Sequence, residues 1–435
     1  MKNIRLAALF LAATVCLAPR ARTAGIPEPI IPEGVGVNIH FTTGHEKDLD
    51  LIAAAGFRFV RMDFFWTDTE PRKGEYNWSA YDGLLAQLDK RGIRAYFIFD
   101  YSHPLYEPAV VSTNPLTGKL ETDVSGSPQH PESIAAFAQW AAAAAKHFQG
   151  RGVIWEIWNE PNGDFWKPKP NVEQYIALAQ ATCRAVREAD PGATIVAPAT
   201  SGFAWDFMEK FAQSGLLAQL DAVSVHPYRA PHQVPESAAG EYQRLRALIE
   251  KYAPEGKKQM PIVSGEWGYS SNTKGVTRER QAEFAARQQL FNLASGIPLS
   301  IWYDWKNDGP DPAENEHNFG TVNTDLTPKP AYTAISTLTR ELNGFRFCAR
   351  FDVRDADKFV LAFTNATRET KLAAWTIGTN NTVTLPLSTA AGEEVSFVNG
   401  TNQPGSLTVE KHQIIVPLNN LPKYLDLKKG NVAWW

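Results

Sequence analysis

Cysteine is scarce in this chain: three occur in 435 residues, at positions 16, 183 and 348. So few thiols exclude a disulfide-stapled scaffold, and none has the neighbouring cysteines or histidines that a zinc site or a nucleophilic thiol requires. Cys183 lies on the apolar stripe of a helix predicted over 172–186. This position favours a buried structural thiol, and a bridge between Cys183 and Cys348 is the alternative.

An excess of charge of one sign is also missing. The 43 Lys and Arg nearly balance the 47 Asp and Glu, and both signs are scattered along the chain. A protein that neutralises phosphates needs a basic stripe, so we expect no nucleic-acid partner.

A long apolar run is absent as well. The apolar segment from Leu6 to Ala18 has 13 residues, which is short of the roughly 20 that a membrane-spanning helix needs. Lys2 and Arg5 before it and the small or polar residues up to Ala24 after it predict a secretory signal over 1–24. We therefore expect a periplasmic or secreted protein without a stable membrane span, with transient or uncleaved association with the inner membrane as the alternative.

Two further motifs are lacking. No glycine-rich phosphate loop follows the first predicted strand, which disfavours an open dinucleotide-binding sheet. His226 and His232 have no carboxylate at a helical spacing, and Asp308 and Asp311 lack the periodicity of a calcium loop. We predict no metal and no cofactor.

What the chain does contain from Gly34 onward is a regular alternation of short apolar runs with amphipathic helical runs. This alternation predicts parallel strands joined by crossover helices. Eight such units in roughly 310 residues favour a closed (β/α)8 TIM barrel, whose sites lie at the carboxyl ends of its strands. The predicted strands are 36–40, 57–63, 94–100, 153–159, 194–198, 222–226, 261–266 and 300–305.

The sequence pattern changes after Gly344, where short runs of alternating apolar and polar residues are separated by Asn, Gly, Asp and Pro turns. We predict a small all-β sandwich over 344–435, after a barrel over 25–343, with the extended segment 26–32 able to join the β domain. Without a long linker between the two parts, we expect them to pack rigidly in a monomer. The predicted β strands are 345–353, 359–365, 371–377, 382–387, 394–398 and 406–418.

Two predicted barrel strands end in a glutamate. The run Ile154 to Ile157 leads through Trp158 and Asn159 to Glu160 and Pro161, and Pro261 to Gly265 leads to Glu266. In a barrel both carboxyl groups would converge on one bowl, and a carboxyl pair is the equipment for cleaving a glycosidic bond. Glu156, deeper in the same strand, is predicted to form a buried pair with Arg58 or Arg61.

Other side chains are expected near this bowl. His40 and His103 are each either a substrate contact or a structural histidine, and aromatic residues of the loops, Trp166 among them, are either ligand contacts or core.

The stretch Trp158-Asn159-Glu160-Pro161 resembles the fourth-strand motif of the clan A retaining (β/α)8 glycoside hydrolases, and Gly265-Glu266-Trp267-Gly268 is similar to their seventh-strand nucleophile motif. The fuller run from Trp155 to Asn162, with Phe165 and Trp166, most resembles glycoside hydrolase family 39, including members that cut bacterial exopolysaccharides. The resemblance extends from Gly34 to about Asn343 and more weakly into the β-sandwich.

The resemblance implies that Glu160 is the acid/base and Glu266 the nucleophile. It further implies that Asn159 binds the sugar 2-hydroxyl, that His226, Tyr228 and Arg61 lie beside the nucleophile, and that Trp302 or Trp305 forms a platform under the reacting sugar. Asp63 and Asp304 depart from the commoner family pattern, which indicates a different sugar.

Electrostatics support this division independently of the family. Arg61 and Tyr228 would hold Glu266 ionised, and its charge would raise the pKa of Glu160 until Glu266 becomes an ester. We therefore expect a retaining glycoside hydrolase that acts on a poly- or oligosaccharide, with endo cleavage of a bacterial exopolysaccharide as the leading hypothesis. The alternatives are an exo-acting β-xylosidase-like enzyme and a catalytically silent barrel that binds glycan for polymer export or assembly.

Overall fold

A computed structural model describes residues 25–114 and 118–428. The predicted signal lies outside these residues. Within them, no helix combines the length and the apolar character that crossing a membrane would require.

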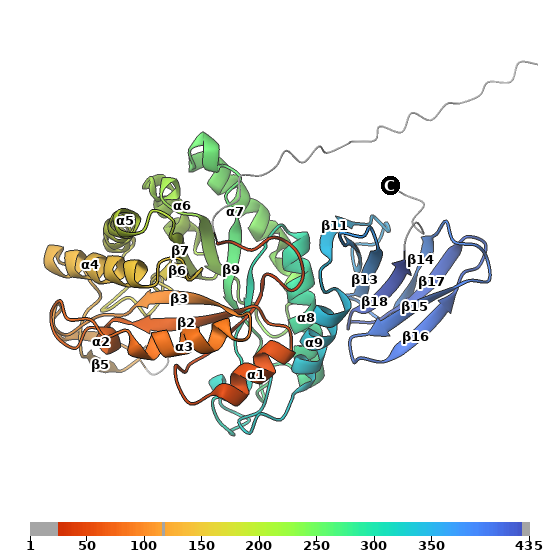
Figure 1. Ribbon diagram of the computed structural model, residues 1–435, viewed down its shortest axis with the longest axis horizontal. Helices are drawn as coiled ribbons and strands as arrows, with labels where there is room; N and C mark the ends of the chain where they lie inside the picture. The colour runs from red at the N-terminus through yellow and green to blue at the C-terminus, as the bar shows by residue number, and fades with distance from the viewer. Residues whose placement is uncertain (1–24, 115–117, 429–435) are drawn as a thin grey trace, which may run out of the picture.

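Eight parallel strands close into a barrel in the order β1-β10-β9-β8-β7-β6-β3-β2 (Figure 1). Each of the eight strands predicted from the sequence corresponds to one of them, so the predicted fold is confirmed. The strands are nearly continuous runs of buried residues, as expected for a sheet covered on both faces. They are β1 (Val35–Asn38), β2 (Phe59–Phe65), β3 (Arg94–Asp100), β6 (Ile154–Ile157), β7 (Thr194–Ser201), β8 (Ala222–His226), β9 (Ile262–Trp267) and β10 (Ser300–Trp302).

Nine α-helices of the described residues surround the barrel or lie in its loops. Their apolar stripes bury against the outer face of the strands, and Asn171 and Thr277 cap α5 and α8 with their side chains. Cys183 is buried in α5, as predicted, while Cys348 is exposed on β11, and both thiols are free. The helices are α1 (Glu46–Ala54), α2 (Trp66–Thr69), α3 (Ser79–Asp89), α4 (Pro131–His147), α5 (Val172–Ala189), α6 (Trp205–Gln213), α7 (Ala239–Tyr252), α8 (Arg278–Ala294) and α9 (Pro330–Glu341).

The interior of the barrel is layered. Its floor is an apolar cluster that includes Phe59, Ile154 and Val263. Above the floor lies a polar layer around Glu156, and Gly265 is what leaves room for it. A Cβ at Gly265 would lie 2.5 Å from Ser224 Oγ and 3.0 Å from Glu156 Oε1. The glycine before Glu266 is therefore required by the buried carboxylate that it faces.

The remaining strands of the described chain form small antiparallel sheets. β4 (Val110–Thr113) and β5 (Leu120–Asp123) make a hairpin between β3 and α4 that was not predicted. After α9, six strands form one sheet in the order β11-β12-β13-β18-β15-β16, and the β14-β17 pair lies across a shared apolar core from it. They are β11 (Arg346–Arg350), β12 (Lys358–Thr364), β13 (Thr370–Thr376), β14 (Asn381–Pro386), β15 (Glu394–Asn399), β16 (Pro404–Thr408), β17 (Gln413–Leu418) and β18 (Lys423–Lys428).

Two details of the β domain differ from, or refine, the sequence prediction. The strand predicted over 406–418 is wrong, because Lys411 and His412 take positive φ values of 46° and 61° in a turn that separates β16 from β17. The segment 26–32 does reach the sandwich: Ile30 forms an antiparallel bridge with Arg346, and Ile31 N–H donates to Phe345 O at 2.9 Å.

The sandwich packs against the barrel through α8 and α9, which lie between the two (Figure 1). At this contact Glu236, in a short 3₁₀ turn (Pro235–Ala238), accepts hydrogen bonds from Arg287 of α8 at 2.6 and 2.8 Å. Trp375 of β13 donates its indole N–H to the same carboxylate at 2.8 Å. All three side chains are buried, so a paired charge ties the two domains together.

Replacing Trp375 with Phe removes one donor to this buried carboxylate and keeps most of the ring. We expect the free energy of unfolding to fall by about 1.5–3 kcal/mol, the range for a hydrogen bond to a charged group. Urea unfolding measures it. In a Glu236→Gln background the same substitution should cost clearly less, and an equal cost in both backgrounds would refute the role of this bond.

Candidate active site

The carboxyl ends of the barrel strands enclose a cavity of about 570 Å³. Of the side chains predicted at the site, His40, Arg61, Asn159, Glu160, Tyr228 and Glu266 line it, together with Asp63. His226 lies fully buried behind Glu160. The alternation of strand residues therefore brings together groups that are far apart in sequence, as the barrel prediction required.

Glu160 is presented by an unusual stretch of backbone. β6 ends at Ile157, and Trp158 and Glu160 both have positive φ, 66° and 45°. Neighbouring strands hold this turn, because Trp158 N–H donates to Phe99 O at 3.1 Å and Glu160 N–H to Ala199 O at 3.0 Å. Non-glycine residues in the left-handed region are uncommon and cluster at functional sites.

Arg61, from β2, is the hub of the polar layer. Its guanidinium donates to Glu156 Oε2 at 2.8 Å and to Glu266 Oε2 at 2.7 Å. It also donates to Asn159 Oδ1 at 2.8 Å and Asn38 Oδ1 at 3.2 Å. Burial alone would lower the pKa of Arg61, but Glu156 and Glu266 raise it well above its ordinary value. The predicted buried pair of Glu156 with an arginine is confirmed.

Glu156 is satisfied within the barrel. Its Oε1 accepts from Tyr96 at 2.6 Å and from Ser224 at 2.5 Å, while its Oε2 faces Arg61. With every partner buried, this carboxylate has no path to substrate and serves to hold the arginine.

The two glutamates at the mouth have different partners. Tyr228 donates to Glu266 Oε1 at 2.7 Å, so Glu266 accepts one bond from a phenol and one from Arg61. Burial, and then the charge of Glu266, raise the pKa of Tyr228 well above its ordinary value, which keeps the hydroxyl a donor. Glu266 thus accepts hydrogen bonds from two donors, Arg61 and Tyr228.

Glu160 is bound by the imidazole of His226, with Nδ1 at 3.0 Å from Oε1. The other ring nitrogen lies 3.3 Å from an Arg61 nitrogen, and because a guanidinium can only donate, Nε2 must accept and Nδ1 must carry the proton. His226, expected beside Glu266, therefore donates to Glu160. One oxygen of each glutamate and one nitrogen of His226 all lie within 4.8 Å of one another.

Four predicted contacts need correction. Trp302 and Trp305 are buried in the core, where their indole N–H groups donate to Phe319 O and Asp48 Oδ1, so neither can lie under a sugar. β10 ends at Trp302, and the chain turns there so that Tyr303 faces the cavity instead. His103 and Trp166 are also buried, bonded to Glu70 O and Gln174 Oε1. All four belong to the supporting structure.

Several lining residues were not predicted as site residues. Asn38 ends β1 and lies two residues before His40, so its side chain points to the same face. The alternation of side chains along a strand could therefore have identified Asn38. Tyr101, known only as a loop aromatic, stacks on Phe165 with ring centroids 5.6 Å apart and also lies 3.0 Å from Asn159 Nδ2. Phe165 had been noted only among the loop aromatics and in the family resemblance. Ser201 ends β7, and the remaining lining residues follow β10; these are Tyr303, Asn315, Glu316 and Phe319.

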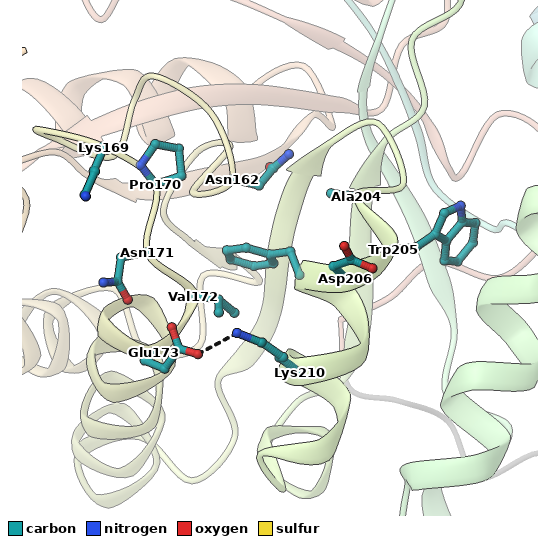
Figure 2. A pocket seen from close by; sticks show the side chains of 11 residues that line it. Asn162, Lys169, Pro170, Asn171, Val172, Glu173, Ala204, Trp205, Asp206 and Lys210 are labelled. Carbon is teal, nitrogen blue, oxygen red and sulfur yellow. Dashed lines mark hydrogen bonds and ion pairs between the residues drawn. The ribbon is translucent and has the colours of Figure 1, made fainter. Parts of the chain in front are cut away.

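A second hollow of about 770 Å³ adjoins this cavity. The two are joined by Asn162 and Ser201, whose side chain and backbone form reciprocal hydrogen bonds of 3.0 and 2.9 Å. Figure 2 shows residues of the β6–α5 loop on one side and of α6 on the other, with the ion pair of Glu173 and Lys210 between them.

The closed barrel with two strand-end glutamates held in this way defines the class of clan A retaining (β/α)8 glycoside hydrolases. A family model described as cellulase (glycosyl hydrolase family 5) matches residues 30–309. The chain belongs to this family.

Known proteins agree with the class. A family 39 glycoside hydrolase from the gut symbiont Bacteroides cellulosilyticus WH2 has a structure similar to this chain, with a TM-score of 0.77 and 25% identity over 92% of this chain and 81% of that one. A monomeric beta-xylosidase from Caulobacter crescentus CB15 shares the fold, with a TM-score of 0.65 and 17% identity over 94% and 98% of the two chains. The predicted likeness to family 39 is confirmed.

In sequence, a beta-xylosidase of Caldicellulosiruptor saccharolyticus is 24% identical over 328 residues, which is 70% of this chain and 64% of that relative. A beta-xylosidase of Geobacillus stearothermophilus is 33% identical over 121 residues, 23% of each chain. This chain thus spans less than two thirds of the length of these curated relatives.

Lys329 holds the loop after β10 through hydrogen bonds, and its contribution to stability depends on pH. Its buried ammonium group donates to Ser271, Asn307 and Asn318 O, each at 3.1 Å. Burial, and then the nearby charge of Arg278, lower its pKa from 10.5 to about 7, against the opposing effect of Asp304.

Between pH 7 and 10.5 the unfolded chain binds a proton at Lys329 that the folded chain has lost, so this residue makes stability rise with pH. The difference in free energy of unfolding between the wild type and Lys329→Met should therefore grow from pH 7 to pH 9, by at most about 1.4 kcal/mol per pH unit. Denaturant unfolding at several pH values measures it, with the exposed Lys146→Met as control. A difference independent of pH would contradict the lowered pKa.

Proposed function

We propose that this chain hydrolyses β-glycosidic bonds of a polysaccharide by double displacement, with Glu160 as acid/base and Glu266 as nucleophile. The observation that carries the proposal is the different environment of two carboxyl groups whose nearest oxygens lie within 4.8 Å. Retaining enzymes place the two groups about 5–5.5 Å apart, whereas inverting enzymes leave about 6.5–9.5 Å for a water molecule. A nearest approach within 4.8 Å is in keeping with the retaining arrangement, in which a glutamate attacks directly.

The hydrogen bonds assign the roles. Glu266, held ionised by Arg61 and Tyr228, attacks the anomeric carbon while Glu160 gives its proton to the departing oxygen. His226 occupies Glu160 Oε1, which leaves Oε2 for the proton. Once Glu266 is an ester its charge is gone, so Glu160 can take a proton from water, which then hydrolyses the ester.

Asn159 is positioned to bind the sugar. Its carbonyl oxygen accepts from Arg61 and one amide hydrogen faces Tyr101 at 3.0 Å, so the second amide hydrogen is left for a hydroxyl in the cavity. His40 and the stacked Tyr101 and Phe165 complete the proposed contacts. The acidic lining, with Asp63 and Glu316, favours a sugar ring without a carboxylate.

Glu160→Gln and Glu266→Gln should each lower kcat by about 10³-fold or more, since both chemical steps need these groups. Release of reducing ends from a polysaccharide panel measures it, with the exposed Glu75→Gln as a matched control. Azide then separates the roles. It should give the α-azide with Glu266→Ala by direct displacement and the β-azide with Glu160→Ala by trapping the ester. Full activity in either glutamine variant would refute the pair.

We also propose endo cleavage of a bacterial exopolysaccharide, supported by the second hollow beside the cavity, which can take sugars beyond the one at the glutamates. An exo-acting β-xylosidase is the second candidate, favoured by the names of the two curated relatives. The size distribution of early products separates them: oligosaccharides indicate endo action and monosaccharide alone indicates exo action. If the wild type binds the polymer but releases no new reducing ends, the catalytically silent glycan-binding barrel becomes the favoured function.

The second hollow gives this proposal a test by mutation. Lys169 and Asp206 line it on opposite sides (Figure 2). The double variant Lys169→Ala/Asp206→Ala should raise KM for a long substrate by about 3- to 10-fold, the worth of one or two polar contacts. Hydrolysis of a small aryl glycoside should not change, because such a substrate occupies only the cavity at the glutamates, and kcat on the long substrate should also stay the same, since the lost contacts are uniform binding.

The control for this test is Asp82→Ala, on the outer helix α3. Equal KM values for the double variant and the wild type on the polymer would remove the hollow from the binding surface.

We further propose that the protein is exported through residues 1–24 and acts in the periplasm or outside the cell as a monomer. Signal processing in the native host and sedimentation of the mature chain test these two points.

A further inference from the structure

Three side chains converge beside the active cavity, at the carboxyl ends of two neighbouring strands. His40 follows β1, and Asp304 and Asp308 follow β10. One nitrogen of His40 and one oxygen of each aspartate lie within 4.8 Å of one another. The side chain of Asp304 is only 2% exposed, and its Oδ1 has no hydrogen-bond partner among the described residues. A buried carboxylate oxygen without a donor lacks a partner that the described residues do not supply, such as a water molecule or a metal ion.

The protonation of His40 follows from its neighbours. Arg61 can only donate, so Asn38 presents its Oδ1 to Arg61 and its amide nitrogen to His40 Nε2, at 3.3 Å. Nε2 must then accept, and the lone pair of this nitrogen lies 3.8 Å from Asp304 Oδ2.

The nearby lysines make no ion pair with this cluster. Lys306 is paired with Asp48 at 2.8 Å, and Lys329 donates to three neutral oxygen atoms of other residues. Across the described part of the chain, no Lys or Arg nitrogen lies within ion-pair distance of either aspartate of the trio.

We propose that His40, Asp304 and Asp308 bind one divalent transition-metal ion, with Zn²⁺ the best match to one imidazole nitrogen and two carboxylates. Two ligands about 2.1 Å from one ion can be up to about 4.2 Å apart, so only a small closure of the trio is needed. The His40 Nε2 lone pair would then bind the ion in place of its 3.3 Å hydrogen bond from the Asn38 amide. A cavity of about 180 Å³ lined by all three residues leads to the surface at the exposed His40 and Asp308.

The proposed ion would join the end of β1 to the loop after β10. His40 also lines the active cavity, so the ion would fix one wall of the substrate site without touching the two glutamates. The site concerns binding and does not depend on the proposed hydrolysis.

Isothermal titration of the EDTA-treated full chain with ZnCl₂ tests the site. We expect one ion per chain, and in Asp308→Asn and His40→Ala an affinity weaker by at least about tenfold, a loss that even outer-sphere partners can cause. The matched control is Asp311→Asn, three residues further along the same exposed loop, which should bind as the wild type does. CaCl₂ should bind far more weakly, because calcium prefers six to eight oxygen ligands.

The proposal is overturned if Zn²⁺ gives no binding heat, or if both variants of the trio bind it as tightly as the wild type. The cluster of Glu160, His226 and Glu266 is the competing location. Binding that is lost in Glu160→Gln and retained in Asp308→Asn would place the ion there and refute this site. Heat with glucosamine and none with Zn²⁺ would instead assign the trio to a substrate ammonium group.

Discussion

The buried guanidinium of Arg61 is the interaction on which the mouth of the barrel depends. It spans the interior from β2 and donates to acceptors from β1, β6, β8 and β9 or the residues that follow them. Glu156 lies below it and supplies the negative charge that offsets the burial of the arginine. Tyr96 and Ser224 donate hydrogen bonds to Glu156, and Gly265 leaves the space that this carboxylate occupies. A buried charge must be paired and hydrogen-bonded, so these residues form one network.

This network also separates the two glutamates chemically. Arg61 donates directly to Glu266, whereas it reaches Glu160 only through His226, whose tautomer it sets. Two side chains of the same type thus acquire different neighbours: two donors that favour the anion in one case, and a neutral imidazole in the other. The same arginine orients Asn38 and, through it, the lone pair of His40. The proposed cation site is therefore connected to the active site through one guanidinium.

Much of the fold followed from the sequence because periodicity is a local property. Eight strands, their order in the chain and the position of Glu160 and Glu266 at strand ends were all read from runs of a few residues. Strand parity indicated that Glu156 points inward and pairs with an arginine, and the structure shows that this arginine is Arg61 and not Arg58. The platform that the family resemblance implied at Trp302 or Trp305 was wrong, because β10 is only three residues long and the chain turns where that strand ends. Periodicity also missed the turn at Lys411, which has no Gly or Pro to mark it.

The sequence by itself determined the barrel, the β domain after it and the two carboxyl groups that face each other, since each depends on patterns within single segments. Only the tertiary structure decided that His226 donates to Glu160 and not to Glu266, because side chains of different strands meet only when the barrel closes. It alone brought His40 to Asp304 and Asp308, which are separated by more than 260 positions in the chain. Hydrogen bonds and charge pairs act over a few ångströms in space, and distance along the sequence does not predict them.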